Sequence, residues 1–79
     1  MDGNQRPMTE GEYRVGTSFN PSGNPVVDAI KNKAADMIDA MREEVPDANH
    51  PGYEASIVAA HKFEEAAMWA VKAVTKQPR

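Results

Sequence analysis

The chain has 79 residues, no cysteine and a formal net charge of −3. Its length limits it to one small domain, whose core is too small to be stable without a further source of stability. The absence of cysteine excludes disulfides and thiolate metal sites, and His50 and His61 are too far apart to suggest a zinc site. We therefore expect association with further copies of the chain to supply this stability. The acidic balance argues against binding of duplex nucleic acid, which normally needs a basic face, but allows a small anionic ligand.

Residues 1–24 are expected to be irregular, because glycine, proline, asparagine, serine and threonine interrupt any regular pattern there. One short turn at residues 8–12 is the exception, with Thr9 as its N-cap. Further along, Phe19 precedes Asn20-Pro21-Ser22-Gly23, so an aromatic ring stands beside a turn. Such a ring either covers the core as a lid or stacks on the base or sugar of a ligand, and the residues leave both readings open.

A first long helix is predicted from Pro25 to about Glu44, with Asn24 as its N-cap and the proline in the first helical position. One arc of roughly 120° on this helix is apolar, and it holds Val26, Val27, Ile30, Ala34, Met37, Ile38 and Met41. Lys31 borders this arc near a helix start that favours anions. It either lays its stem along the apolar surface or binds an anion.

A loop bounded by Pro46 and Pro51 returns the chain, so that a second helix, expected from Glu54 to Lys76, packs antiparallel on the first. This second helix has no glycine or proline, and its apolar arc spans about 200°. A helix that only covers one neighbour needs an arc of little more than about 100°. We therefore expect the excess to pack against another copy. Residues 77–79 are expected to fray.

Two residues interrupt the pattern of the second helix. Glu64 falls inside the apolar arc, where a carboxylate is costly unless it is hydrogen-bonded. It either meets a donor from the other helix or a neighbouring subunit, or it lies at a wet edge. Trp69 falls among polar residues, and it either belongs to an interface or lies flat over its own helix.

The residues suggest neither an enzyme nor a cofactor. His61 could pair with Glu64 or Glu65, but this spacing is common on solvated helix faces, and adjacent carboxylates diverge by about 100°. No phosphate-cradling glycine pattern is present, and no apolar run approaches the roughly 20 residues of a membrane span. The predicted fold is therefore all-α: an irregular segment at 1–24, an antiparallel two-helix hairpin at 25–76 and a frayed tail at 77–79, assembled as an oligomer.

Three stretches resemble a phage family. These are Phe19-Asn20-Pro21-Ser22-Gly23, Ile30-Lys31 and the run from Phe63 to Ala73, whose Glu-Glu-Ala-x-Met-Trp-Ala core is the most specific part. The family is that of the helical-hairpin sponges that counter the CBASS and Thoeris defence systems. The resemblance implies a compact hexamer that binds cyclic oligonucleotide second messengers without cleaving them, in the cytoplasm of the infected bacterium.

The resemblance also implies a site. In the family, an aromatic residue before the first helix and a basic residue on that helix grip a cyclic dinucleotide between two protomers, and the matching positions here are Phe19 and Lys31. Asn20 and Pro21 would shape the loop and add to the site, with Arg14 and Lys33 as weaker candidates. This chain has Phe-Asn where relatives often have Tyr-His, and a histidine at 61 where a small hydroxyl residue is frequent. These departures leave the messenger open.

The hypothesis that follows is a sponge for cyclic dinucleotides such as cGAMP. Cyclic trinucleotides and cyclic ADP-ribose isomers are further candidate ligands. The rival hypothesis is a structural or partner-binding module whose wide helix face docks on a different protein and which binds no nucleotide. A phosphodiesterase that degrades the messenger is a third hypothesis, which the lack of metal ligands disfavours.

Overall fold

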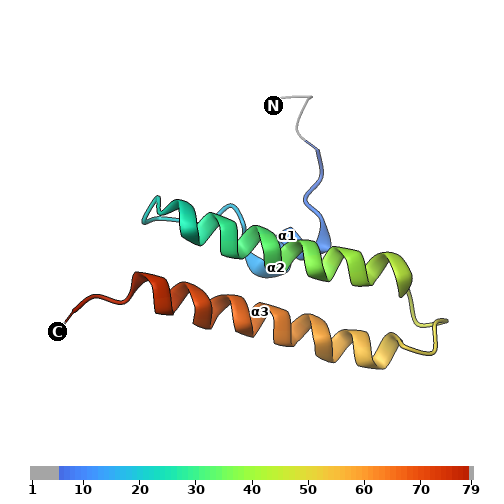
Figure 1. Ribbon diagram of the computed structural model, residues 1–79. Coiled ribbons are helices and arrows are strands. Elements are labelled where there is room, and N and C mark those ends of the chain that lie inside the picture. The colour runs from blue at the N-terminus through green and yellow to red at the C-terminus, as the bar shows by residue number, and fades with distance from the viewer. Residues whose placement is uncertain (1–5, 79) are drawn as a thin grey trace.

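The computed structural model describes residues 6–78, which form three α-helices and no strand. The bounds are Glu10–Val15 for α1, Pro25–Glu44 for α2 and Tyr53–Thr75 for α3. The two long helices run side by side in opposite directions, and α1 lies across α2 (Figure 1). The all-α prediction is confirmed. The two-helix description was incomplete, because the N-terminal segment contains a helix of its own.

Local signals explain why α1 forms. Thr9 and Glu12 make a reciprocal capping box, in which Glu12 N–H donates to Thr9 Oγ1 (3.1 Å) and Thr9 N–H donates to Glu12 Oε1 (2.9 Å). Gly16 ends the helix in the left-handed conformation at φ 76°, which glycine adopts without a steric cost. Thr9 is thus the N-cap that the sequence predicts, and the helix runs three residues beyond the expected turn.

The hairpin follows its predicted signals closely. The Asn24 side chain accepts a hydrogen bond from Val26 N–H at 2.8 Å, and Pro25 opens α2. The best-buried apolar residues come from both long helices, and they are Val27, Ala35, Ile38, Ala60 and Ala67. Among them Ile38 has no exposed surface, and burying one such side chain stabilises the fold by about 1.5–3 kcal/mol. Small alanines on α3 let the helices approach closely.

The second buried face of α2 was not predicted. Ala35 is 2% exposed because α1 lies against it: the nearest approach is at Gly11, where a Cβ would stand 2.2 Å from the Ala35 carbonyl oxygen. Conversely, Val26 and Met37, which the sequence placed in the apolar arc of this helix, are 50% and 53% exposed. The buried surface of α2 is rotated toward α1, which a two-helix description could not anticipate.

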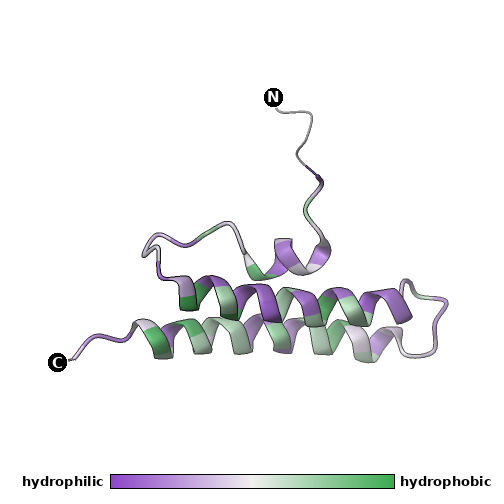
Figure 2. Ribbon diagram, turned by 45° about the horizontal axis from the view of Figure 1, so that its top comes forward, coloured by the Kyte–Doolittle hydropathy of each residue, from purple (hydrophilic) through white to green (hydrophobic). Residues whose placement is uncertain are grey.

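The molecule leaves much of α3 uncovered. The Cα trace measures 49 × 36 × 13 Å, so the molecule is thin in one direction. Figure 2 shows hydrophobic colour along most of α3, whereas α2 has several hydrophilic stretches. Large side chains of α3 are exposed, namely Val58, Met68, Trp69 and Val74. The Lys72 ammonium lies 5.0 Å from the centroid of the Trp69 ring. Within residues 6–78, no helix is both long and apolar enough for a membrane span.

Candidate ligand-binding site

The loop between α1 and α2 is folded by its own polar side chains. The Asn20 amide donates to the carbonyl of Asn24 and to Asp28 Oδ1, both at 2.9 Å, and so ties the loop to the first turn of α2. Ser22 Oγ donates to Asn20 Oδ1 at 2.8 Å, and Gly23 N–H donates to the Asn20 carbonyl. Asn20 therefore uses its whole amide to hold the turn, which fixes the backbone on either side of it.

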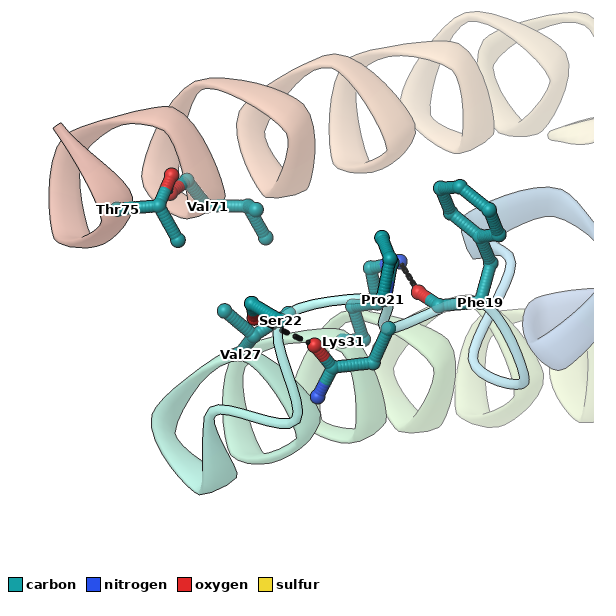
Figure 3. A pocket seen from close by; sticks show the side chains of 8 residues that line it. Phe19, Pro21, Ser22, Val27, Lys31, Val71 and Thr75 are labelled. Atoms are coloured by element: carbon teal, nitrogen blue, oxygen red, sulfur yellow. Dashed lines mark hydrogen bonds between the residues drawn. The ribbon is translucent and has the colours of Figure 1, made fainter.

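Lys31 reaches from α2 to this loop. Its ammonium donates to the carbonyl of Gly16 at 3.1 Å and to the carbonyl of Phe19, and it lies 5.4 Å from the centroid of the Phe19 ring. Figure 3 shows the Lys31–Phe19 hydrogen bond, with the ring standing off the loop. Since a lysine ammonium has three protons, one remains for another acceptor. No carboxylate pairs with Lys31 within the described chain.

Phe19 and Lys31 line two adjoining cavities. One, of about 240 Å³, lies between the loop, the start of α2 and the end of α3 (Figure 3), and its walls are Phe19, Asn20, Pro21, Ser22, Val27, Lys31, Val71 and Thr75. The other, of about 310 Å³, is lined by Val15, Phe19, Lys31, Ala67, Met68 and Val71. Lys31 is the one charged residue in either wall. The remaining walls are apolar or neutral, and the Phe19 ring is 67% exposed. This combination suits an anion that carries flat rings.

A larger cavity has the opposite charge balance. It measures about 640 Å³ and is lined by Glu10, Tyr13, Arg14 and Glu64. Arg14 Nε donates to Glu10 at 2.8 Å, and its Nη1 donates to Glu64 at 2.9 Å. A guanidinium held by two carboxylates has little attraction left for an anion, so this cavity is a poor anion site despite its size.

These ion pairs identify the partner of Glu64 and shift a neighbouring pKa. The sequence left Glu64 either with a donor on the other long helix or a neighbouring subunit, or at a wet edge. In the structure its side chain is 31% exposed and its donor is Arg14 of α1, an element that neither reading named. Glu10 accepts from Arg42 at 2.9 Å as well as from Arg14. Hydrogen bonds first from Arg42 and then from Arg14 lower the pKa of the Glu10 carboxyl below its ordinary value.

The structure brings together four of the residues that the sequence proposed for the site. Phe19, Asn20, Pro21 and Lys31 all line the same cavity. Arg14 and Lys33 are not among these walls: Arg14 is paired with Glu10 and Glu64, and Lys33 is exposed. Sequence reasoning missed several walls, which are Val15, Ser22, Met68, Val71 and Thr75. Met68 and Val71 carried a signal only as members of the broad apolar arc.

The described residues offer no constellation for catalysis by a metal. Across residues 6–78 no three side chains of His, Asp or Glu are grouped so that they could hold a metal ion. His61 lies beside Glu64 and Glu65 at the surface, in a cavity of about 230 Å³ whose walls do not include Lys31. The cavities beside Phe19 and Lys31 therefore have groups for binding a ligand.

Comparison with known protein families gives a match over most of the chain. The family model described as the hairpin domain of Acb2/Tad1 matches residues 11–75, which is most of the chain. Searches of curated proteins and of solved structures return no match.

Proposed function

The chain belongs to the Acb2/Tad1 hairpin family of phage cyclic-nucleotide sponges, and we propose that it binds cyclic dinucleotides of bacterial immunity in the cavities beside Phe19. Proteins of this family sequester nucleotides and are not enzymes.

One observation carries the proposal: the Phe19 ring and the Lys31 ammonium lie 5.4 Å apart in walls that contain no carboxylate. A cyclic dinucleotide presents two anionic phosphates and two flat bases. Phe19 would stack on a base, since aromatic faces accept any nucleobase. The third proton of the Lys31 ammonium would be donated to a phosphate oxygen in a charge-assisted hydrogen bond. Asn20 and Pro21 would keep the loop in the shape that presents both groups.

The site needs a second chain to enclose its ligand. Cavities of about 240 and 310 Å³ stand at or below the lower end of ligand pockets, which measure roughly 300–1,000 Å³. The uncovered apolar residues of α3 include Met68, a wall of the second cavity. Packing these faces together would stabilise the thin hairpin and complete the walls. We infer a homo-oligomer, a hexamer as the family resemblance implies, with one ligand between each pair of chains.

Sequestration explains how such a protein would serve a phage without catalysis. A binder that is present in excess lowers the free concentration of its ligand by mass action. In the cytoplasm of an infected bacterium, this would keep the messenger below the level that activates a CBASS effector. Cyclic trinucleotides and cyclic ADP-ribose isomers are the further ligands to be tested, because they present the same combination of phosphate and base.

A release experiment tests the proposal. The full chain is incubated with 3′,3′-cGAMP, unbound nucleotide is removed by ultrafiltration, and the protein is denatured by heat. Chromatography of the supernatant should recover intact nucleotide in proportion to the protein. Recovery of linear products would contradict sequestration. If the protein retains neither 3′,3′-cGAMP nor any of the cyclic trinucleotides and cyclic ADP-ribose isomers, the result would favour the rival hypothesis of a partner-binding module.

A further inference from the structure

We propose that α1 is a positioning element that holds the loop from Gly16 to Asn24 in its binding conformation. This inference rests on the proposed function, because it assigns to α1 the affinity of the Phe19–Lys31 site. The residues that act in this way touch no ligand. They are Gly11, Asp39, Glu10, Arg42 and the Arg14–Glu64 pair.

The contact between α1 and α2 is closer than side-chain packing allows. Gly11 N–H donates to Asp39 Oδ1 at 2.7 Å, and Gly11 itself is buried. A Cβ at this position would lie 2.2 Å from the Ala35 carbonyl oxygen and 2.8 Å from Asp39 Oδ1, so only glycine fits. Since Gly11 is in the first turn of α1, its N–H has no acceptor within the helix. Asp39 thus satisfies a helix-start donor from another helix and fixes where α1 begins.

Ion pairs then tie α1 to both long helices. Glu10 accepts from Arg42 of α2, whose Nη1 also donates to the buried Ser56 hydroxyl of α3 at 2.9 Å. One turn further on, Arg14 pairs with Glu64 of α3 at 2.9 Å. The side chains of these charged residues are between 18% and 34% exposed, so solvent screens them less than fully exposed pairs. A six-residue helix is too short to be stable alone, so these contacts give α1 its place.

Gly16 links this docked helix to the ligand loop. Its N–H donates to the Glu12 carbonyl at 2.9 Å and closes α1, and its own carbonyl accepts from both Phe19 N–H (3.0 Å) and Lys31 Nζ (3.1 Å). The backbone of Phe19 and the ammonium of Lys31 are therefore both hydrogen-bonded to the Gly16 carbonyl, whose position α1 determines. Val15, the last residue of α1, also lines the second cavity. If α1 moves, the aromatic ring and the cation lose their common anchor.

Amide hydrogen exchange of the ligand-free chain tests this coupling directly. In Asp39→Ala, the Phe19 amide should exchange at least about tenfold faster, while the Ile38 amide in the core of α2 keeps its protection. Asp39→Asn keeps an oxygen that can accept from Gly11 and should restore most of the protection of Phe19. Asp36→Ala, which removes an exposed carboxylate of the same helix, is the matched control and should change neither amide.

Titration of the same variants with 3′,3′-cGAMP provides the second readout. Asp39→Ala should weaken binding by a factor similar to its loss of Phe19 protection, with Asp39→Asn close to the wild type. Faster exchange at Gly11 with unchanged exchange at Phe19 would overturn the inference, as would an equal acceleration at Ile38. A wild type that binds no cyclic nucleotide would refute the proposed function, while the exchange data would still decide whether α1 holds the loop.

Discussion

Two clusters of side chains near α1 differ in the partners of their cations. In the first cluster, Arg14 pairs with Glu10 and Glu64, and Arg42 pairs with Glu10, so each arginine has a carboxylate partner. In the second, Lys31 lies beside Phe19, with backbone carbonyls and an aromatic ring around its ammonium but no carboxylate in the described structure. The first cluster builds the fold, and the second is left with attraction for an anion. Whether a cation can bind an anionic ligand therefore depends more on its partners within the chain than on the size of the cavity beside it.

Removing the cation of the second cluster should have the largest effect on binding. Lys31→Ala should weaken affinity for a cyclic dinucleotide by roughly 10- to 150-fold, because a hydrogen bond to a charged group contributes about 1.5–3 kcal/mol. Isothermal titration of the folded oligomer measures this loss. Lys33→Ala, an exposed lysine two residues away on the same helix, is the control and should bind as the wild type does. Equal losses of affinity in both variants would mean that Lys31 acts only through the net charge of the chain and not through a specific contact.

Removing the ring beside that cation should weaken binding by roughly 5- to 150-fold, since base stacking on an aromatic side chain contributes about 1–3 kcal/mol. The change is Phe19→Ala, and Phe19→Tyr, which keeps the aromatic face, is its matched variant. The Phe19 side chain is exposed, so the melting temperature should hardly change in either. Because the wild type already contains two tyrosines and one tryptophan, stronger quenching of tyrosine emission by bound nucleotide in Phe19→Tyr than in the wild type would be an independent sign of stacking. Full affinity in Phe19→Ala would exclude stacking at this position.

Breaking the first cluster should cost stability before affinity. Arg14→Ala removes the pairs with Glu10 and Glu64 and should lower the free energy of unfolding by up to about 1 kcal/mol for each, as partly exposed pairs usually do. Urea denaturation followed by circular dichroism measures this change. The affinity loss should be smaller than that of Lys31→Ala, because Arg14 acts only through α1. A loss as large as that of Lys31→Ala would place Arg14 in the ligand site and erase the contrast between the clusters.

Acid should produce the smallest effect and should act through two carboxyls of α1, which are Glu10 of the first cluster and Glu12, the partner of Arg6. Hydrogen bonds, above all from Arg6, lower the pKa of Glu12 to about 2, and those from Arg42 and Arg14 lower that of Glu10. Carboxyls with a lowered pKa stabilise the fold at pH values above their unfolded pKa, near 4.5, and this contribution fades as the pH falls toward 2. The Gly11 and Gly16 amides should therefore lose exchange protection over this range before Ile38 does. Simultaneous loss at all three would mean that α1 has no separate acid-sensitive attachment.

The sequence predicted the parts of the fold that local signals determine. The Thr9 and Asn24 caps, the Pro25 start and the two long helices are confirmed, because caps and apolar periodicity act over a few residues. The packing of α1 on α2 could not be predicted in this way. It depends on Gly11 and Ala35, two small residues 24 positions apart whose sequence surroundings give no sign that they touch. For the same reason, the sequence does not identify Arg14 as the partner of Glu64.

The candidate site divides along the same line. Phe19 and Lys31 could be proposed from a resemblance and a border position on a helix, and the structure does place them side by side. Their use of shared backbone carbonyls follows from the path of the loop, which no periodicity describes. The resemblance ranks Lys31 above Arg14, but the physical difference between them appears only with their partners: Arg14 is paired with two carboxylates, and Lys31 is paired with none in the described structure. That Phe19 and Lys31 bind the ligand is a prediction, which the experiments above test.

The most direct test is isothermal titration of the full chain with 3′,3′-cGAMP and related cyclic di- and trinucleotides, with the oligomeric mass read by light scattering on the same sample. The account predicts tight binding at one cyclic dinucleotide for every two chains of a hexamer. A well-folded chain that releases no heat with any of these nucleotides, or with cyclic ADP-ribose isomers, would contradict it.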